Sequence, residues 1–139
     1  MAWNGFVPDS EITDRVTAKT VEFAEKFGNY LGQTDKTPDG KKITASKLTT
    51  NQLRKFFGEV KRQQLQGYDE SSFVMLKPKL AYAVGRADKN NKIRDFYDVI
   101  AKAMDLVDNE LKFKNFVQVF EAIVAYHKAA EAGIQLNQK

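Results

Sequence analysis

The residues of this sequence whose chemistry is most concentrated are the lysines and arginines in the middle of the chain. Residues 41–62 hold seven of them against one carboxylate, Glu59, and residues 77–94 hold six against Asp88. Cationic side chains one helical turn apart can contact successive phosphates of a nucleic acid, which gives affinity without sequence choice. The pattern, with a net charge of +4 and a pI near 9.2, favours a surface for a polyanion. A solvated basic face with no such partner is the alternative.

One aromatic side chain lies within the second basic stretch. Lys79, Tyr82 and Arg86 have the spacing i, i+3 and i+7, which places them on one face of a helix. A tyrosine between two cations can stack on a base, so Tyr82 is a candidate stacking residue. Packing beside the neighbouring apolar stripe is the alternative for Tyr82.

Side chains suited to catalysis or metal binding are sparse. The chain has no cysteine, and its one histidine, His127, lies on the apolar face of the last predicted helix, where a hydrogen-bonded core residue is expected. The pairs Asp95/Asp98 and Asp105/Asp108 have i, i+3 spacing, but they lie on the polar side of an amphipathic helix, where solvated carboxylates are normal. We therefore expect a binding protein that is not an enzyme, with no catalytic residue, no metal and no cofactor.

The elements that position these residues have helical periodicity nearly throughout. A first helix is predicted over about 10–31, with Asp9 or Ser10 as its N-terminal cap. Two glycines, Gly28 and Gly32, mark its end.

Residues 32–47 interrupt the helical pattern. The segment contains a Pro-Asp-Gly turn signal and few apolar residues. It predicts a long loop, or alternatively a short hairpin, with Lys41 and Lys42 at or near the tip.

The second helix has the clearest start in the sequence. Thr49 and Gln52 have the spacing of a capping box, in which each side chain satisfies a backbone amide of the first turn. One apolar face follows: Leu53, Phe56, Phe57 and Val60. The basic residues lie away from that face: Arg54 and Lys61 together, with Lys55 and Arg62 beside them.

The third element contains a proline in an otherwise helical pattern. Its apolar stripe is formed by Phe73, Leu76, Leu80 and Val84. Pro78 cannot donate a hydrogen bond to the carbonyl of Val74, and it disfavours helical geometry at Lys77. Either the helix kinks there, which would direct Lys77 and Lys79 away from the core, or one short helix ends and another begins with Pro78 in its first turn.

Two more helices complete the pattern, at about 91–108 and 111–132. The last is apolar almost all round, as expected of a helix buried on most sides or in contact with another chain. The fold class is therefore all-α: one domain over 1–139, a compact bundle of about five helices, with flexible ends at 1–8 and 133–139. No apolar run approaches the ~20 residues that span a bilayer, and no secretory signal is evident. The absence of cysteine suits a cytoplasmic location.

Three segments together resemble a known family. They are "LTTNQLRKFFGEVKR" (48–62), "MLKPKLAYAVGR" (75–86) and "FVQVFEAIVAYHK" (116–128). In order, spacing and residue identity they are similar to the small subunit of type III-A CRISPR effector complexes, the Csm assembly. The resemblance covers most of residues 48–128 and does not extend to the N-terminal third.

The resemblance implies a compact, non-catalytic helical subunit that stacks head to tail as an inner filament. Its implied partners are the guide RNA, the target RNA and the other subunits of the effector complex, with self-association head to tail or as a homodimer in isolation and no membrane contact. It would hold the guide–target duplex through its phosphates, because base pairing supplies the specificity. Carried onto this sequence, the implied RNA contacts are Lys47, Arg54, Lys55, Lys61, Arg62, Lys77, Lys79 and Arg86.

Two other functions remain open from the residues alone. One is a stand-alone helical nucleic-acid-binding protein, and the other is an interaction module whose basic face meets an acidic protein. A helix-turn-helix domain is disfavoured, because the basic residues run along the helices rather than gathering at one helix N-terminus.

Overall fold

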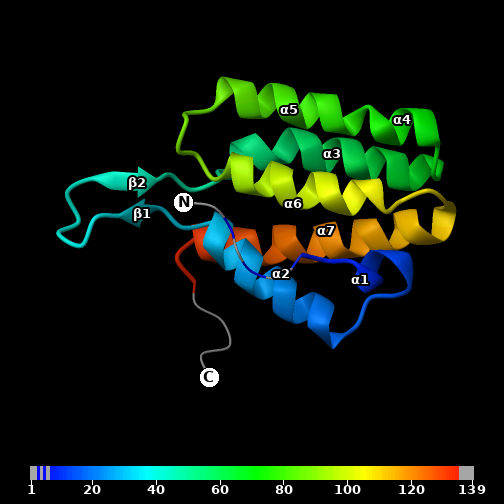
Figure 1. Ribbon diagram of the computed structural model, residues 1–139, viewed down its shortest axis with the longest axis horizontal. Helices are drawn as coiled ribbons and strands as arrows, with labels where there is room; N and C mark the ends of the chain where they lie inside the picture. The colour runs from blue at the N-terminus through cyan, green and yellow to red at the C-terminus, as the bar shows by residue number, and fades with distance from the viewer. Residues whose placement is uncertain (1–2, 4, 6, 135–139) are drawn as a thin grey trace.

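The computed structural model describes residues 3, 5 and 7–134 of the 139-residue chain (Figure 1). Its elements, in order, are α1 (Ser10–Thr13), α2 (Ala18–Leu31), β1 (Asp35–Lys36), β2 (Ile43–Ala45), α3 (Thr50–Gln66), α4 (Glu70–Val74), α5 (Leu76–Arg86), α6 (Ile93–Asp105) and α7 (Glu110–Glu131). The predicted all-α class is confirmed, with one short antiparallel strand pair added. Helix α7 lies between α1 and α2 on one side and the layer formed by α3 to α6 on the other.

The first predicted helix is divided in two, and the prediction of one helix over 10–31 was wrong. Thr17 starts a new helix, because its hydroxyl accepts from the amide of Lys19 while its own amide donates to Thr20 Oγ1 at 2.9 Å. Asn115 of α7 fixes the break by donating its side-chain amide to the carbonyl oxygens of Ile12 and Asp14, at 2.9 and 3.0 Å.

The third predicted element is also two helices, which is the second of the two alternatives for Pro78. Helix α4 ends at Val74 and α5 begins at Leu76, so Pro78 lies in the first turn of α5, where a missing amide does no harm. Lys77 is nevertheless helical, contrary to the expectation that Pro78 would exclude it. Because two of the predicted helices are each divided in two, the described residues form seven helices, where about five were predicted.

The segment at 32–47 contains a hairpin rather than a structureless loop. Asp35 pairs with Ala45 and Lys36 with Ile43. The β1–β2 hairpin projects from the bundle at the end where α3 begins and α5 ends (Figure 1).

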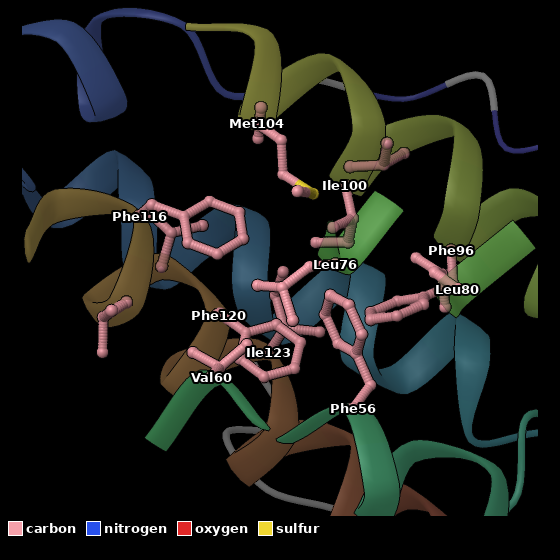
Figure 2. Packing of buried hydrophobic residues seen from close by; sticks show 14 of the residues in the cluster. Phe56, Val60, Leu76, Leu80, Phe96, Ile100, Met104, Phe116, Phe120 and Ile123 are labelled. Carbon is pink, nitrogen blue, oxygen red and sulfur yellow. The ribbon is translucent and has the colours of Figure 1, made fainter. Parts of the chain in front are cut away.

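Helix α7 is the central helix of the bundle and is buried on most sides, which is one of the two arrangements expected from its sequence. Phe120 is fully buried and contacts the rings of Phe56 and Phe96 at centroid distances of 5.4 and 6.0 Å. Figure 2 shows these rings converging with Leu76, Leu80 and residues of α6 and α7. A fully buried aliphatic or Phe side chain contributes ~1.5–3 kcal/mol, so this cluster is the main source of stability on that side of α7.

Helices α2 and α7 pack backbone to backbone. A Cβ atom added at Gly28 would lie 2.7 Å from the amide nitrogen of His127 and 2.9 Å from the carbonyl oxygen of Ile123. At Gly32 it would lie 2.8 Å from the Cβ atom of Ala130. The two glycines therefore permit close approach of the helices. The prediction that both mark the helix end holds for Gly32, the C-terminal cap, and was wrong for Gly28, which lies inside α2.

Both ends of the chain were predicted to be flexible. At the start, the Trp3 ring packs against Phe27 and Tyr30 at centroid distances of 5.0 and 5.3 Å, and Pro8 is buried. At the other end, 135–139 lie outside the described residues. No helix among the residues that the structure describes is both long enough and apolar enough to span a membrane.

Candidate nucleic-acid interface

The start of α3 is held firmly, and it positions the first basic cluster. The predicted capping box is present: Gln52 N donates to Thr49 Oγ1 at 3.2 Å, and Thr49 N donates to Gln52 Oε1 at 2.8 Å. Glu131, at the end of α7, accepts from both the amide and the hydroxyl of Thr50. This carboxylate at a helix N-terminus also complements the helix dipole.

An open groove of about 720 Å³ lies between α3 and α5. Its apolar lining includes Phe56 and Leu80, whose side chains also belong to the core. Its cationic lining is Lys55 from α3 together with Lys79 and Arg86 from α5. The structure thus brings cations of both basic stretches to one surface, and we call these three residues the groove cations.

One carboxylate lies among the groove residues. Glu59 accepts from Arg62 at 2.7 Å and from Lys79 at 3.4 Å. The hydrogen bond from Arg62 is the main cause that lowers the pKa of Glu59, with burial opposing it and Lys79 contributing further. Glu59 is therefore ionised at neutral pH and holds a cation from each helix beside the groove.

Tyr82 is exposed in the groove and is not packed into the core. Its side chain is 69% exposed and lines the groove. The guanidinium carbon of Arg86 lies 5.8 Å from the centroid of its ring, within cation–π range. The alternative of Tyr82 as a packing residue is therefore not what the structure shows.

The remaining predicted contacts lie outside the groove. Lys61 pairs with Glu121 of α7, and Arg54 is exposed and shares that side of α3 by helical spacing. Lys77 pairs with Asp105 of α6. Lys77 and Lys79 thus point to different neighbours because successive helical positions are ~100° apart, and no kink at Pro78 is required.

Lys47 lies at the same end of the bundle as the start of α3. Its side chain is half-buried, and its charge is one of the smaller causes that lower the pKa of Glu131. Lys47 is therefore close to the N-terminus of α3 but does not line the groove.

Lys92, counted among the cations of the second basic stretch, is not on the surface. It is 2% exposed, and its ammonium donates to the carbonyl oxygens of Tyr30 and Gln33, both at 2.8 Å, and to Asp35 Oδ1 at 3.0 Å. Three acceptors satisfy all three N–H bonds of the ammonium. Lys92 thus joins the end of α2, the hairpin and the start of α6, and its role is structural.

Two residues considered for catalysis or metal binding, His127 and Asp95, are buried and hydrogen-bonded. His127 is 1% exposed and its Nε2 lies 2.6 Å from the carbonyl oxygen of Leu48, so the prediction of a core histidine is confirmed. Asp95, expected to be solvated, is 6% exposed and accepts from the Tyr30 hydroxyl. Burial, followed by this hydrogen bond, raises the pKa of Tyr30. Within the described part of the chain, no three His, Asp or Glu residues are grouped closely enough to hold a metal ion.

Two polar residues of the groove, Asn51 and Gln52, were not among the candidates that the sequence pattern indicated. Asn51 precedes Lys55 by four residues, and Lys55 precedes Glu59 by four, so all three share one side of α3. That i, i+4 spacing was the signal that separates this side from the side of Arg54 and Lys61.

Comparison with protein families gives one result for this chain. The family model described as Csm2 Type III-A matches residues 14–132. The comparisons with curated proteins and with solved structures found no match. The family match includes all the groove residues and extends into the N-terminal third, where the resemblance of the sequence had not reached. The chain belongs to the Csm2 family and is a small subunit of a type III-A CRISPR complex.

Proposed function

We propose that this chain is the non-catalytic inner-filament subunit of its complex, and that the groove between α3 and α5 holds the backbone of the guide–target RNA. The observation that carries the proposal is the convergence of Lys55, Lys79 and Arg86 from two helices on one open groove. Three cations on one surface can contact neighbouring phosphates. Such contacts position an RNA duplex without selecting its sequence.

Tyr82 supplies the second part of the proposed interface. Its exposed ring lies among the groove cations, beside Arg86. An aromatic face beside a guanidinium accepts a base or a ribose regardless of identity. The side chain therefore contributes affinity at an unpaired or displaced nucleotide, while the cations hold the phosphates.

Glu59 supports this surface by holding two cations in place. Arg62 and Lys79 share it as a partner, so each is oriented before RNA arrives. Exposed ion pairs of this kind contribute ~0–1 kcal/mol, so exchange of a carboxylate for a phosphate costs little. We include Arg62 in the interface as a residue at the edge of the groove.

The opposite end of the bundle is proposed as a contact with a neighbouring subunit. Leu65 near the end of α3 is 89% exposed and Leu111 at the start of α7 is 59% exposed. Tyr68 N donates to Glu110 Oε1 at 3.1 Å, which places the two helix ends together. An exposed apolar pair at the end away from the hairpin suits head-to-tail stacking, and incorporation of the chain during reconstitution of the complex measures it.

The test of the RNA interface is charge reversal of the groove cations. We expect K55E/K79E/R86E to weaken target-RNA binding by the assembled, guide-loaded complex at least about 30-fold, because each lost phosphate contact removes a favourable electrostatic term. The matched control is R15E/K19E/K26E, which changes the net charge equally on and before α2, on the other side of α7. Filter binding or fluorescence anisotropy measures affinity, and size-exclusion chromatography checks assembly.

Wild-type affinity in the groove variant would contradict the proposal. Equal losses in both would mean that net charge matters and the groove does not. A far-UV circular dichroism spectrum that matches wild type excludes unfolding as the cause in either variant.

A further inference from the structure

The β1–β2 hairpin carries a second group of cations that lies outside the groove. Its exposed side chains include Lys36 on β1 and Lys41 and Lys42 beside the turn. Figure 1 shows it extending beyond the bundle, from the end where α3 begins and α5 ends. The hairpin therefore begins near the part of the groove that Lys55 and Arg86 line.

The base of the hairpin is tied firmly to the bundle. The ammonium of Lys92 binds Asp35 and the carbonyl oxygen of Gln33 on the β1 side. On the β2 side, Ser46 N donates to the Asn90 carbonyl at 3.1 Å, and Lys92 N donates to the Ser46 carbonyl at 2.9 Å. With both strands anchored, the hairpin has a defined direction.

The turn is equally well defined by hydrogen bonds. The Asp39 carboxylate accepts from the Thr37 hydroxyl and from the amide of Lys41 at 2.9 Å. The amide of Lys42 donates to Thr37 Oγ1 at 3.2 Å, and Gly40 adopts a positive φ of 74°. The carboxylate is thus occupied by its own turn, and the backbone at Lys41 and Lys42 is fixed.

The hairpin lysines differ in their partners from several lysines of the helices. Lys61, Lys77 and Lys79 each form an ion pair. Among the residues that the structure describes, no carboxylate pairs with Lys36, Lys41 or Lys42. A phosphate at the tip therefore meets cations that no internal contact neutralises.

An apolar side chain stands next to these cations. Ile43 is 55% exposed, although it lies within a strand of the hairpin. Proteins that bind the minor groove of a duplex combine basic side chains with apolar side chains that insert between base steps. The adjacent lysines at the tip, beside a groove with the same charge, favour a phosphate backbone over an acidic protein as the occupant.

From these contacts we infer that the hairpin tip is a separate nucleic-acid contact, in which Lys41 and Lys42 bind backbone phosphates and Ile43 packs against the sugars. The inference rests on the proposed RNA-binding function and extends it to a site outside the groove. At ~3.3 Å per residue, the four residue steps from Ala45 to Lys41 span up to about 13 Å. The hairpin therefore reaches phosphates that the groove cations do not contact.

The experiment compares K41E/K42E with K19E/K26E, a pair of reversals of equal charge on α2, in the assembled guide-loaded complex. The probe is a fluorescent target RNA complementary to the guide, measured by anisotropy at several salt concentrations. We expect the hairpin variant to bind about five- to ten-fold more weakly, with a salt slope lower by about 1.5, as two lost phosphate contacts predict. The control keeps the wild-type affinity and slope.

A third variant distinguishes binding that needs the ordered turn from attraction by positive charge alone. D39A removes the acceptor that orders the turn while making the tip more positive. We expect its affinity to fall about two-fold, whereas attraction by charge alone makes it rise. A rise would overturn the ordered-tip part of the inference.

The remaining outcomes separate this inference from the proposed function. Loss of RNA binding in K55E/K79E/R86E with wild-type binding in K41E/K42E overturns the hairpin contact and leaves the groove. Wild-type binding in both variants overturns both. Loss of K41E/K42E from the complex on size-exclusion chromatography, with the control retained, shows a protein contact at the tip and also overturns the inference.

Discussion

The pair α2–α7 and the pair α3–α5 are packed in opposite ways. Between α2 and α7 there is no room for a single methyl group at Gly28, because an added Cβ atom would lie under 3 Å from the α7 backbone. Between α3 and α5 there is an open groove of about 720 Å³, lined by three cations. One side of α7 is therefore closed by backbone contact, and the other presents a charged surface.

The contrast shows that, in this small bundle, the contacts that stabilise the fold and the exposed cations lie in different places. The closed pair fixes the position of α7, and α7 in turn supports α3 through Phe120 and Phe56. The cations of α3 and α5 then need not serve the core, since apolar side chains below them do so. Substitutions on the closed side should therefore alter stability, whereas those in the groove should alter RNA binding.

The largest loss of stability is expected at Lys92, which ties the start of α6 to the end of α2. Lys92→Met keeps the length of the side chain but leaves Asp35 and two carbonyl oxygens without their shared donor. Removal of one partner from a buried ionic network costs ~3–5 kcal/mol. We expect the unfolding free energy to fall by about 3 kcal/mol, at the low end of this range, because Asp35 is 35% exposed and water can solvate it.

Chemical denaturation measures this loss, and Lys89→Met is the matched control. Lys89 is exposed three residues earlier in the chain, so its substitution should stay within ~0.5 kcal/mol of wild type. Similar values for the two variants would show that the buried ammonium contributes nothing to the stability of the fold.

A smaller loss is expected where the two helix backbones meet. Gly28→Ala forces α2 away from α7, and overpacking of this kind costs ~1–3 kcal/mol. The control is Gly58→Ala in α3, where an added Cβ meets nothing within 4 Å. Alanine there should stabilise the helix by ~0.5–1 kcal/mol.

Thermal unfolding followed by circular dichroism distinguishes the two glycines. The melting temperature should fall for Gly28→Ala and rise for Gly58→Ala. A fall in both would mean that the loss at Gly28 is a general effect of alanine at a helical glycine and does not come from close contact with α7.

The smallest effect concerns Glu131, which connects the two sides by capping α3 from α7. Burial acts to raise the pKa of its carboxyl, but the hydrogen bonds from the Thr50 hydroxyl and amide outweigh burial and lower it. Because the folded pKa is below the ordinary value of 4.5, the contribution of Glu131 is present above about pH 4.5 and is lost as the pH falls through the folded pKa.

Glu131→Gln should therefore cost ~0.5–1 kcal/mol at neutral pH. The difference in unfolding free energy from wild type should shrink as the pH falls below about 4.5. Denaturation at pH 7 and at pH 3 to 4 measures it, and a difference that stays constant across this range would show that ionisation of Glu131 plays no part.

Much of the helical architecture follows from local sequence patterns. The capping box at Thr49 and Gln52 and the apolar face of α3 involve residues within two turns of one another, so they could be predicted. The break at Thr17 has a local signal, the Thr17/Thr20 capping pair, which was missed because threonine stands where a capping box usually has Glu or Gln. The side chain of Asn115, which also holds the break, lies about a hundred residues away, and no local pattern reveals its part.

The same distinction explains the candidate site. Helical spacing could show that Lys55 and Arg54 lie on different sides of α3, but not which side faces α5. Lys92 was indistinguishable in sequence from an exposed lysine, because its three acceptors come from residues 30–35. The groove itself results from the way α3 and α5 are set apart by tertiary packing, which the pattern of charges does not encode.

The most direct test of the proposed RNA-binding groove is the salt dependence of target-RNA binding by the assembled complex. For wild type and R15E/K19E/K26E, the logarithm of the affinity should fall along the same slope against the logarithm of salt concentration. For K55E/K79E/R86E the slope should be smaller by about 2 to 3, since each phosphate contact contributes ~0.7–0.9. A groove variant with the wild-type slope and affinity would contradict an RNA backbone held between α3 and α5.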